Sequence, residues 1–70
     1  MTPAEKALIE CMKKHGKPMN MRDLLLAKFY PGMQPEWLNR MLRKLCVSNR
    51  IVRRKDTDTG YLVFSLTQEG

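Results

Sequence analysis

Seven arginine and lysine side chains, with no aspartate or glutamate among them, occupy the 16 positions from Arg40 to Lys55. The whole chain of 70 residues carries 13 basic and 7 acidic residues, so the positions outside this segment hold 6 basic and 7 acidic ones. The formal net charge of +6 therefore belongs to one segment. Positive charge gathered in one stretch is typical of a nucleic-acid contact. The alternative is a charged surface that contacts only water.

Three side chains with metal-binding chemistry occur in parts of the sequence that are helical in pattern. His15 follows Cys11 by four residues on one face of a helix, and Cys46 lies in a later helix. A structural zinc site needs four ligands, and the sequence offers neither a fourth Cys or His nor a paired-ligand motif. Residues 56–60 are similar to the opening of a calcium-binding loop, but its twelfth position would be Thr67 instead of a glutamate. We expect no metal and no cofactor.

The sequence offers little for catalysis. A nucleophilic side chain needs an activating base, and the one histidine, His15, has no obvious serine or acidic partner in the sequence. A chain of 70 residues also leaves little room for a buried active-site cleft. We therefore expect a protein that is not an enzyme.

The apolar residues are spread along the chain in short runs. None of these runs approaches the roughly 20 residues that a membrane-spanning helix requires. The first ten residues, MTPAEKALIE, are charged where a signal peptide is apolar. We expect a cytoplasmic protein, associated with the nucleoid through its basic segment, with no membrane partner.

The first predicted helix lies at the amino terminus. Thr2 supplies a capping hydroxyl, Pro3 suits the first helical position, and Glu5 stands three residues after the cap. Apolar residues then recur at helical spacing, and Gly16 is typical of a helix end. This pattern predicts a helix over residues 3–15.

The second predicted helix follows a short connector. Residues 17–19 contain a proline that disfavours helix, so we expect them to be extended. Asn20 is a capping residue, and Asp23 stands at the third helical position. We expect a helix over residues 21–29, ended by the proline–glycine pair at positions 31 and 32.

The third predicted helix contains part of the basic segment. Pro35 suits its first position, and apolar residues at helical spacing predict a helix over residues 35–48. Asn49 tolerates the left-handed conformation that ends many helices. The buried stripe of this helix is expected to contain Leu38, Met41, Leu42 and Leu45.

Two strand-like runs complete the chain. β-Branched and aromatic residues are concentrated at residues 51–55 and 61–66, and the turn-forming residues between them predict a single hairpin. Alternation along the runs favours an inward-facing set of Val52, Leu62, Phe64 and Leu66, although the first run is too short for alternation to fix which of its faces is inward.

Three helices followed by a two-stranded β-hairpin resemble the winged helix-turn-helix domain of bacterial and phage transcription regulators. The resemblance covers nearly the whole chain and includes the tight turn between the second and third helices. It implies an α+β fold in which residues 1–70 form a single winged-helix domain. The residues that carry it are Leu38, Leu42, Leu45, Asn49, Ile51, Val52, Gly60, Tyr61 and the ending Leu66-Thr67-Gln68-Glu69-Gly70, which is similar to the L-T-x-x-G that follows the wing in MarR-like and PadR-like proteins.

The acidic tip of the hairpin departs from that pattern. Wings that enter a minor groove tend to have basic tips, whereas Asp56 and Asp58 would be repelled by phosphates. We therefore expect no deep insertion of the hairpin. Such regulators also often continue into dimerising helices, so the chain is either a minimal regulator or a domain of a longer protein.

The resemblance implies that the third helix enters the DNA major groove, where its amino-terminal residues reach base edges. Arginine pairs with guanine and asparagine with adenine through two hydrogen bonds, while glutamate or glutamine accepts from cytosine. Hydration of the helix surface is the alternative. The expected base contacts are Gln34, Glu36, Asn39, Arg40 and Arg43.

The other cations are expected to hold phosphates, which set position and affinity without reading sequence. Six to ten such contacts would lower affinity by roughly 10³ to 10⁵ between 50 and 200 mM salt. The expected phosphate contacts are Lys44, Arg50, Arg53, Arg54 and Lys55, with Lys17 and Arg22 as further ones near the start of the second helix.

Four apolar or aromatic residues lie off the main buried stripes, namely Ile9, Leu26, Tyr30 and Trp37. They are candidates for a dimer or partner surface. Single exposed apolar residues are common, and a tryptophan on a helix flank more often packs on a neighbouring element.

The charge and the resemblance together lead us to expect a small, sequence-specific protein that binds double-stranded DNA and regulates transcription. A single domain reads a short site, so a homodimer, tandem sites or a protein partner would be needed for specificity. The chief alternative is a winged-helix interaction module that docks an acidic protein partner. RNA binding is disfavoured because the sequence offers no cluster of exposed aromatic residues for stacking.

Overall fold

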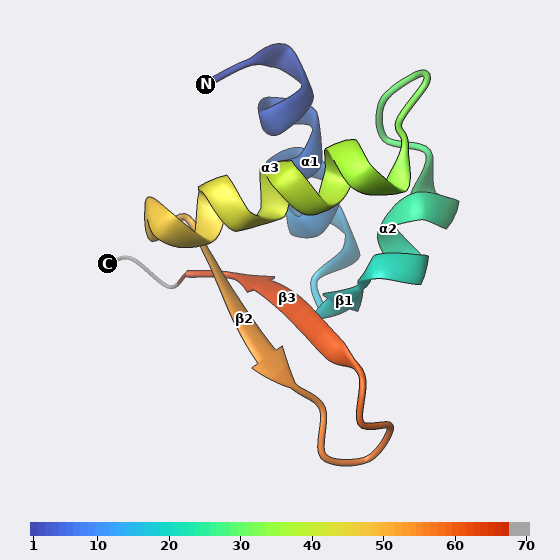
Figure 1. Ribbon diagram of the computed structural model, residues 1–70, viewed down its shortest axis with the longest axis vertical. Coiled ribbons are helices and arrows are strands. Elements are labelled where there is room, and N and C mark those ends of the chain that lie inside the picture. The colour runs from blue at the N-terminus through green and yellow to red at the C-terminus, as the bar shows by residue number, and fades with distance from the viewer. Residues whose placement is uncertain (68–70) are drawn as a thin grey trace.

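The computed structural model, which describes residues 1–67, contains three helices and a three-stranded antiparallel sheet (Figure 1). In chain order the elements are α1 (Pro3–His15), β1 (Met19–Asn20), α2 (Met21–Ala27), α3 (Pro35–Val47), β2 (Ile51–Lys55) and β3 (Leu62–Leu66). The fold is therefore α+β. Within residues 1–67, no helix is long and apolar enough to cross a membrane. The last three residues of the ending that carries part of the resemblance, Gln68, Glu69 and Gly70, lie outside the described residues.

Helix α1 has the bounds that the sequence predicts. A capping box fixes its start, in which the Thr2 hydroxyl accepts from the Glu5 N–H at 3.2 Å and the Glu5 carboxylate accepts from the Thr2 N–H at 2.8 Å. Gly16 ends the helix in the left-handed conformation, with φ of 72°, and donates its N–H to the Met12 carbonyl at 3.1 Å.

The carboxylate of Glu5 is buried, since the residue is only 4% exposed. The hydrogen bond from the Thr2 N–H lowers the pKa of Glu5 below its ordinary value of 4.5, and desolvation of the carboxylate opposes this shift. The positive charge of Lys44 also lowers the pKa, because its Nζ lies 3.8 Å from the Glu5 Oε2. A carboxylate with a lowered pKa in the folded state stabilises the fold fully above its unfolded pKa. That contribution is lost as the pH falls below 4.5 and through the lower folded value.

Replacing Glu5 with glutamine is expected to lower the free energy of unfolding by about 1 kcal/mol at pH 7 and by less at pH 3. The reason is that the stabilisation by the Glu5 carboxylate declines once the pH falls below 4.5, the ordinary value of its pKa. Urea unfolding at both pH values, followed by circular dichroism, measures the difference. Glu10→Gln is the matched control, because the Glu10 side chain lies on the same helix and is 73% exposed. An equal loss at both pH values would contradict the assignment.

Helix α2 begins as predicted but ends earlier. Its capping box is present, with the Asn20 side chain accepting from the Asp23 N–H at 2.7 Å and the Asp23 carboxylate accepting from the Asn20 N–H at 3.2 Å. The predicted end at Phe29 is wrong, because Lys28 adopts the left-handed conformation with φ of 49° and stops the helix after Ala27. The turn lets Phe29 pack against the core.

Helix α3 ends at Val47, one residue before the predicted end. The hydroxyl of Ser48 donates to the carbonyls of Lys44 and Leu45 at 3.1 and 3.2 Å. These carbonyls at the helix end also accept from the backbone N–H groups of Ser48 and Arg50. Asn49 is left-handed, with φ of 60°, as predicted. The chain reverses there and enters β2.

The sheet contains a strand that the sequence does not predict. Strand β1 begins at the last residue of the expected connector and pairs antiparallel with β3. The strand order is β1-β3-β2. Met19 lies opposite Phe64, and Asn20 lies opposite Val63. The expectation of a two-stranded sheet is therefore wrong, because two residues are too few to show an alternating pattern.

The hairpin faces the core differently from the prediction. Ile51 and Phe64 are 2% and 6% exposed, whereas Val52 and Leu62 are 37% and 49% exposed. The inward assignment of Val52 and Leu62 is wrong for two separate reasons. Val52 lies on the strand face opposite to its neighbour Ile51. Leu62, which begins β3 one residue later than predicted, lies beyond the edge of the core.

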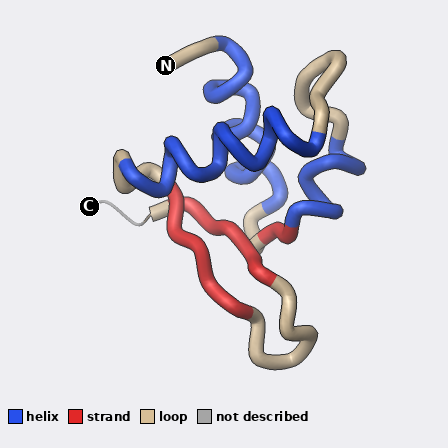
Figure 2. The backbone as a smooth tube through the Cα atoms, viewed as in Figure 1, coloured by secondary structure: helices blue, strands red, loops and turns tan. Residues whose placement is uncertain are grey.

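One hydrophobic core joins all the helices to the sheet. The four residues predicted as the buried stripe of α3 all belong to it. Figure 2 shows that the closed end of the hairpin extends away from the three helices. The core consists of Ala4, Leu8, Met12, Met19, Leu24, Leu38, Met41, Leu42, Leu45, Ile51 and Phe64.

Candidate nucleic-acid interface

The exposed side of α3 presents the residues predicted to contact bases. Because the apolar stripe of α3 is buried, the polar positions on the opposite side face solvent. Gln34 precedes the helix and makes no side-chain capping bond, so its amide is not used by the helix start. The predicted base contacts on the helix itself, Glu36, Asn39, Arg40 and Arg43, are all exposed.

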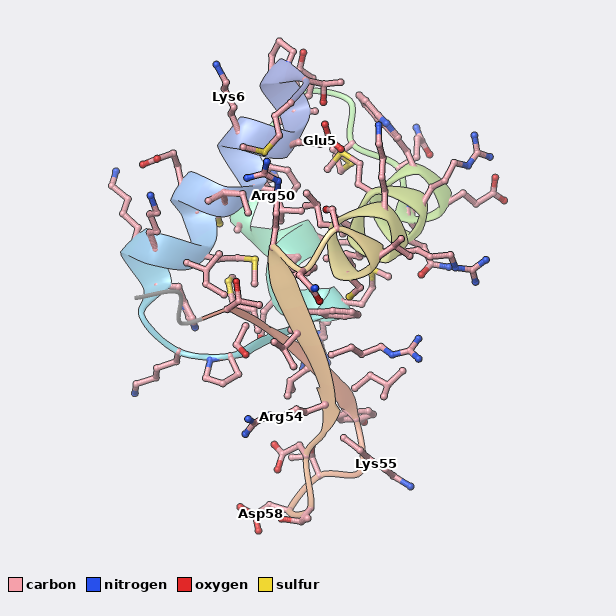
Figure 3. The ribbon with its side chains drawn as sticks, turned by 90° about the vertical axis from the view of Figure 1, so that its left-hand side faces the viewer. Glu5, Lys6, Arg50, Arg54, Lys55 and Asp58 are labelled. Carbon is pink, nitrogen blue, oxygen red and sulfur yellow. The ribbon has the colours of Figure 1, made fainter. Side chains whose placement is uncertain are left out.

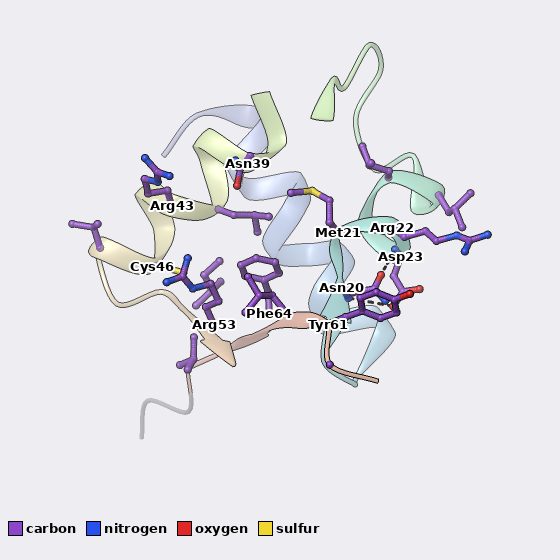
Figure 4. Close-up of a pocket in the computed structure, with 18 of the residues that line it drawn as sticks. Asn20, Met21, Arg22, Asp23, Asn39, Arg43, Cys46, Arg53, Tyr61 and Phe64 are labelled. Atoms are coloured by element: carbon purple, nitrogen blue, oxygen red, sulfur yellow. Dashed lines mark hydrogen bonds between the residues drawn. The ribbon is translucent and has the colours of Figure 1, made fainter. Parts of the chain in front are cut away.

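Two cations of the hairpin lie on the side of the sheet that faces α3. Arg53 lines a groove shared with α3, and Figure 4 shows its guanidinium directed from β2 toward Cys46. Lys55 follows two residues later and so lies on the same strand face. We call the set Arg40, Arg43, Arg53 and Lys55 the basic face. It combines cations from a helix and from a strand, which the sequence shows only as one charged run.

Three of the predicted phosphate contacts lie elsewhere. Arg54 is on the opposite strand face, and Figure 3 shows Arg54 and Lys55 pointing to opposite sides of the hairpin. Arg50 is directed toward α1 (Figure 3) and lines a smaller hollow of about 360 Å³. Lys44 lies on the flank of α3 next to α1, where its Nζ is 3.8 Å from the Glu5 carboxylate. The structure therefore divides the basic segment between two sides of the molecule.

The two cations near the start of α2 are also separated from each other. Arg22 lines the groove beside α2, and Figure 4 shows its guanidinium directed outward. Lys17 is exposed in the connector before β1, and the residues that line the groove begin with Asn20. Arg22 therefore shares a groove with Arg43 and Arg53 of the basic face, and Lys17 does not line that groove.

The hairpin tip is a tight turn built by its aspartates. The Asp58 N–H donates to the Asp56 carboxylate at 3.0 Å, and the Gly60 N–H donates to the Asp56 carbonyl at 2.7 Å. Gly60 adopts a φ of 78°, which favours glycine. Asp58 lies at the far end of the hairpin (Figure 3), so any phosphate approaching the tip meets negative charge.

A groove of about 1610 Å³ lies between α2, α3 and the hairpin (Figure 4). Leu42 and Phe64, which are buried core residues, form part of its floor. Its basic lining residues are Arg22, Arg43 and Arg53, and among the described residues Asp23 is its one acidic lining residue.

The residues predicted as a partner surface do not form one patch. Tyr30 and Trp37 contact each other edge to face, with ring centroids 5.8 Å apart, and Trp37 is 39% exposed. Leu26 lines the large groove, and Ile9 lines the smaller hollow. The structure therefore gives these four residues three separate positions.

The cysteines and the histidine do not form a metal site. Within residues 1–67, no group of three His, Cys, Asp or Glu side chains could hold a metal ion. Cys46 lines the large groove, while Cys11 packs against the core from α1. Burial raises the pKa of the Cys11 thiol, which disfavours the thiolate that a metal would bind.

The sequence does not reveal the apolar edge of the large groove. Val47 is 82% exposed and Tyr61 63% exposed, and both line the groove. Helical spacing could have indicated Val47, because it follows Arg43 by four residues on the polar side of α3. Tyr61 lies at the same groove as Val47 only because of how the hairpin folds, which residue spacing does not indicate.

Protein-family models, curated proteins and solved structures were compared with the chain, and none of them matches it. What the site does must therefore be argued from the geometry and charge of the basic face and of the groove beside it.

Proposed function

We propose that the protein is a small winged-helix DNA-binding protein that regulates transcription, with α3 in the major groove of double-stranded DNA. The observation that carries this proposal is the basic face. Arg40 and Arg43 are exposed on α3, Arg43 and Arg53 line one groove, and Lys55 lies on the same strand face as Arg53. A duplex carries a negative charge every ~1.7 Å, so such a surface attracts it strongly.

The dimensions of α3 suit this role. Its 13 residues span about 20 Å at 1.5 Å per residue, and a major groove about 12 Å wide admits a helix. The helix is held rigidly, because its other side is the largest contribution to the core. A rigid helix presents side chains to base edges at little cost in conformational entropy.

The proposed DNA contacts divide into residues that read bases and residues that hold phosphates. Arg40 and Arg43 can each pair with guanine through two hydrogen bonds, and Asn39 can pair with adenine in the same way. Gln34 and Glu36, at the helix start, can accept from cytosine. Arg53 and Lys55 contact phosphates beside the major groove of the DNA, whereas Lys44, Arg50 and Arg54 lie away from the basic face.

Four of the seven predicted phosphate contacts remain once Lys44, Arg50 and Arg54 are left out, namely Lys17, Arg22, Arg53 and Lys55. Four such contacts give a slope near −3.6 in log affinity against log salt, so binding to a labelled mixed-sequence duplex should weaken roughly a hundredfold between 50 and 200 mM salt. This loss of affinity is smaller than the one that six to ten phosphate contacts would give, because Lys44, Arg50 and Arg54 lie away from the basic face. Fluorescence anisotropy at the two salt concentrations measures it. An affinity that does not depend on salt would contradict the proposal.

The adjacent arginines of β2 provide a matched control. Arg53→Ala should reduce the salt slope by about 0.9, and Arg54→Ala should leave it unchanged, because only Arg53 lies on the basic face. Equal effects of the two substitutions would show that the hairpin does not approach DNA with the side that faces α3.

A further inference from the structure

We infer that the groove between α2, α3 and the hairpin is a docking site for an amphipathic, acidic helix of a protein partner, and that its occupancy excludes DNA from α3. The observations that support the docking site do not depend on the proposed function. The exclusion of DNA rests on the proposed function.

The first observation is the concentration of exposed apolar side chains at this groove. Within the described chain, seven large apolar residues are exposed, and five of them line the groove. Scattered exposed apolar residues are ordinary, but several gathered around one concave surface are typical of an interaction site. Four of the five, Leu26, Val47, Tyr61 and Leu62, are 68%, 82%, 63% and 49% exposed. The fifth, Val52, is 37% exposed and lies on the strand face opposite to Arg53, at the rim of the groove.

DNA does not account for these apolar residues. Glu36 and Arg40, which are proposed to read bases, do not line the groove, so base reading leaves most of the groove unused. A phosphate backbone is held by charges and hydrogen bonds and gains little from apolar walls. The apolar lining needs an apolar occupant, which a protein segment can supply.

The second observation is the charge around the groove. Arg22, Arg43 and Arg53 line it, and Asp23 is the only acidic lining residue among those described. An occupant with carboxylates flanking its apolar residues would complement this edge. A basic segment would be repelled by these guanidinium groups, and a neutral one would gain no charge pairing with them.

The size of the groove favours a helix over a small molecule. Its volume of about 1610 Å³ exceeds the 300–1,000 Å³ that is usual for small-molecule sites. Helix-in-groove recognition uses apolar residues at i, i+3 or i+4, and i+7, which insert along a groove bounded by polar residues. The groove runs between two helices and a hairpin, as this kind of docking requires (Figure 4).

Competition with DNA follows from two shared residues. Asn39 and Arg43 belong both to the exposed side of α3 and to the groove lining. A carboxylate that pairs with Arg43 removes a cation that DNA would use. The partner would thereby control how much of the protein is free to bind DNA.

The test uses a fluorescein-labelled synthetic peptide of about 16 residues, with leucines at i, i+4, i+7 and i+11 and mostly glutamates elsewhere. Two matched peptides replace either the leucines with serine or the glutamates with lysine. By anisotropy, the first peptide should bind at least about tenfold more tightly than either of the others. Equal binding of the leucine and serine peptides, or no binding of the first peptide, would overturn the inference.

Two substitutions in the protein locate the contact. Val47→Ser and Leu62→Ser each remove an exposed apolar side chain from the groove edge, and each should weaken the first peptide at least about tenfold. Trp37→Ser is the control, because Trp37 is an exposed apolar residue of α3 outside the groove. Circular dichroism of each variant establishes that it is folded. Loss of binding in the control and not in the groove variants would overturn the assignment.

A displacement experiment separates this inference from the proposed function. Unlabelled peptide should release a labelled duplex from the protein at 50 mM salt. A peptide that binds without releasing the duplex would overturn the competition. A protein that binds the peptide but no duplex at low salt would overturn the proposed function and leave the docking site supported.

Discussion

Replacing Arg40 and Arg43 together with glutamate should abolish binding to double-stranded DNA while leaving the fold intact. Each arginine that pairs with guanine contributes about 1 to 3 kcal/mol, and two glutamates add repulsion from phosphates, so affinity should fall by at least about a thousandfold. Both side chains are exposed and lie opposite the buried stripe of α3. Anisotropy with a labelled duplex at 50 mM salt measures the loss, and thermal unfolding verifies the fold.

Reversal of two lysines on α1 is the matched control for the change in net charge. Lys6 and Lys13 are exposed and seven residues apart, so they lie on one side of α1, and Figure 3 shows Lys6 pointing away from α3. Lys6→Glu with Lys13→Glu should weaken DNA binding far less than the double variant on α3. Similar losses in the two double variants would mean that net charge alone drives binding, and unchanged binding in the α3 variant would refute α3 as the reading helix.

The single variant Arg40→Glu distinguishes the two surfaces that meet on α3. Arg40 is exposed on the helix but does not line the groove, whereas Arg43 belongs to both. Arg40→Glu should therefore weaken the duplex strongly and the acidic peptide only through long-range charge. A variant that loses both ligands equally would show that they use one undivided surface.

The helix starts could be predicted because their signals are local. Thr2 with Glu5, and Asn20 with Asp23, satisfy backbone donors within three residues, and both capping boxes are present in the structure. The end of α2 could not be predicted in this way. Lys28 is left-handed although its residue type gives no such signal, and its conformation accompanies the packing of Phe29 on the core.

The candidate site was predictable as a charged run but not as a surface. The number of cations is visible in the sequence, but which of them face α3 depends on strand register and on which strand face meets the core. Arg53 and Arg54 are chemically identical neighbours, and pairing with Phe64 and Val63 places them on opposite faces. The groove depends on still longer-range order, because α2 and the hairpin are brought together partly by the two-residue strand β1.

Replacing Leu24 with alanine should destabilise the protein more than any surface substitution proposed above. Leu24 is fully buried and is the one buried residue of α2, a helix of seven residues that is too short to be stable without tertiary contacts. A buried leucine replaced by alanine costs about 2 to 5 kcal/mol, against a total stability of roughly 4 to 10 kcal/mol for a chain of this length. The melting temperature should fall by at least about 10 °C, measured by circular dichroism.

Leu26 is the matched control, because it is the same residue type on the same helix and is 68% exposed. Leu26→Ala should change the melting temperature by no more than a few degrees, since surface substitutions usually stay within about 0.5 kcal/mol, yet it should weaken the acidic peptide because Leu26 lines the groove. If Leu24→Ala were as stable as Leu26→Ala, the core would not be what holds α2 in place. The position of α2 beside the groove would then depend on strand β1 and on the partly buried residues Met21 and Leu25.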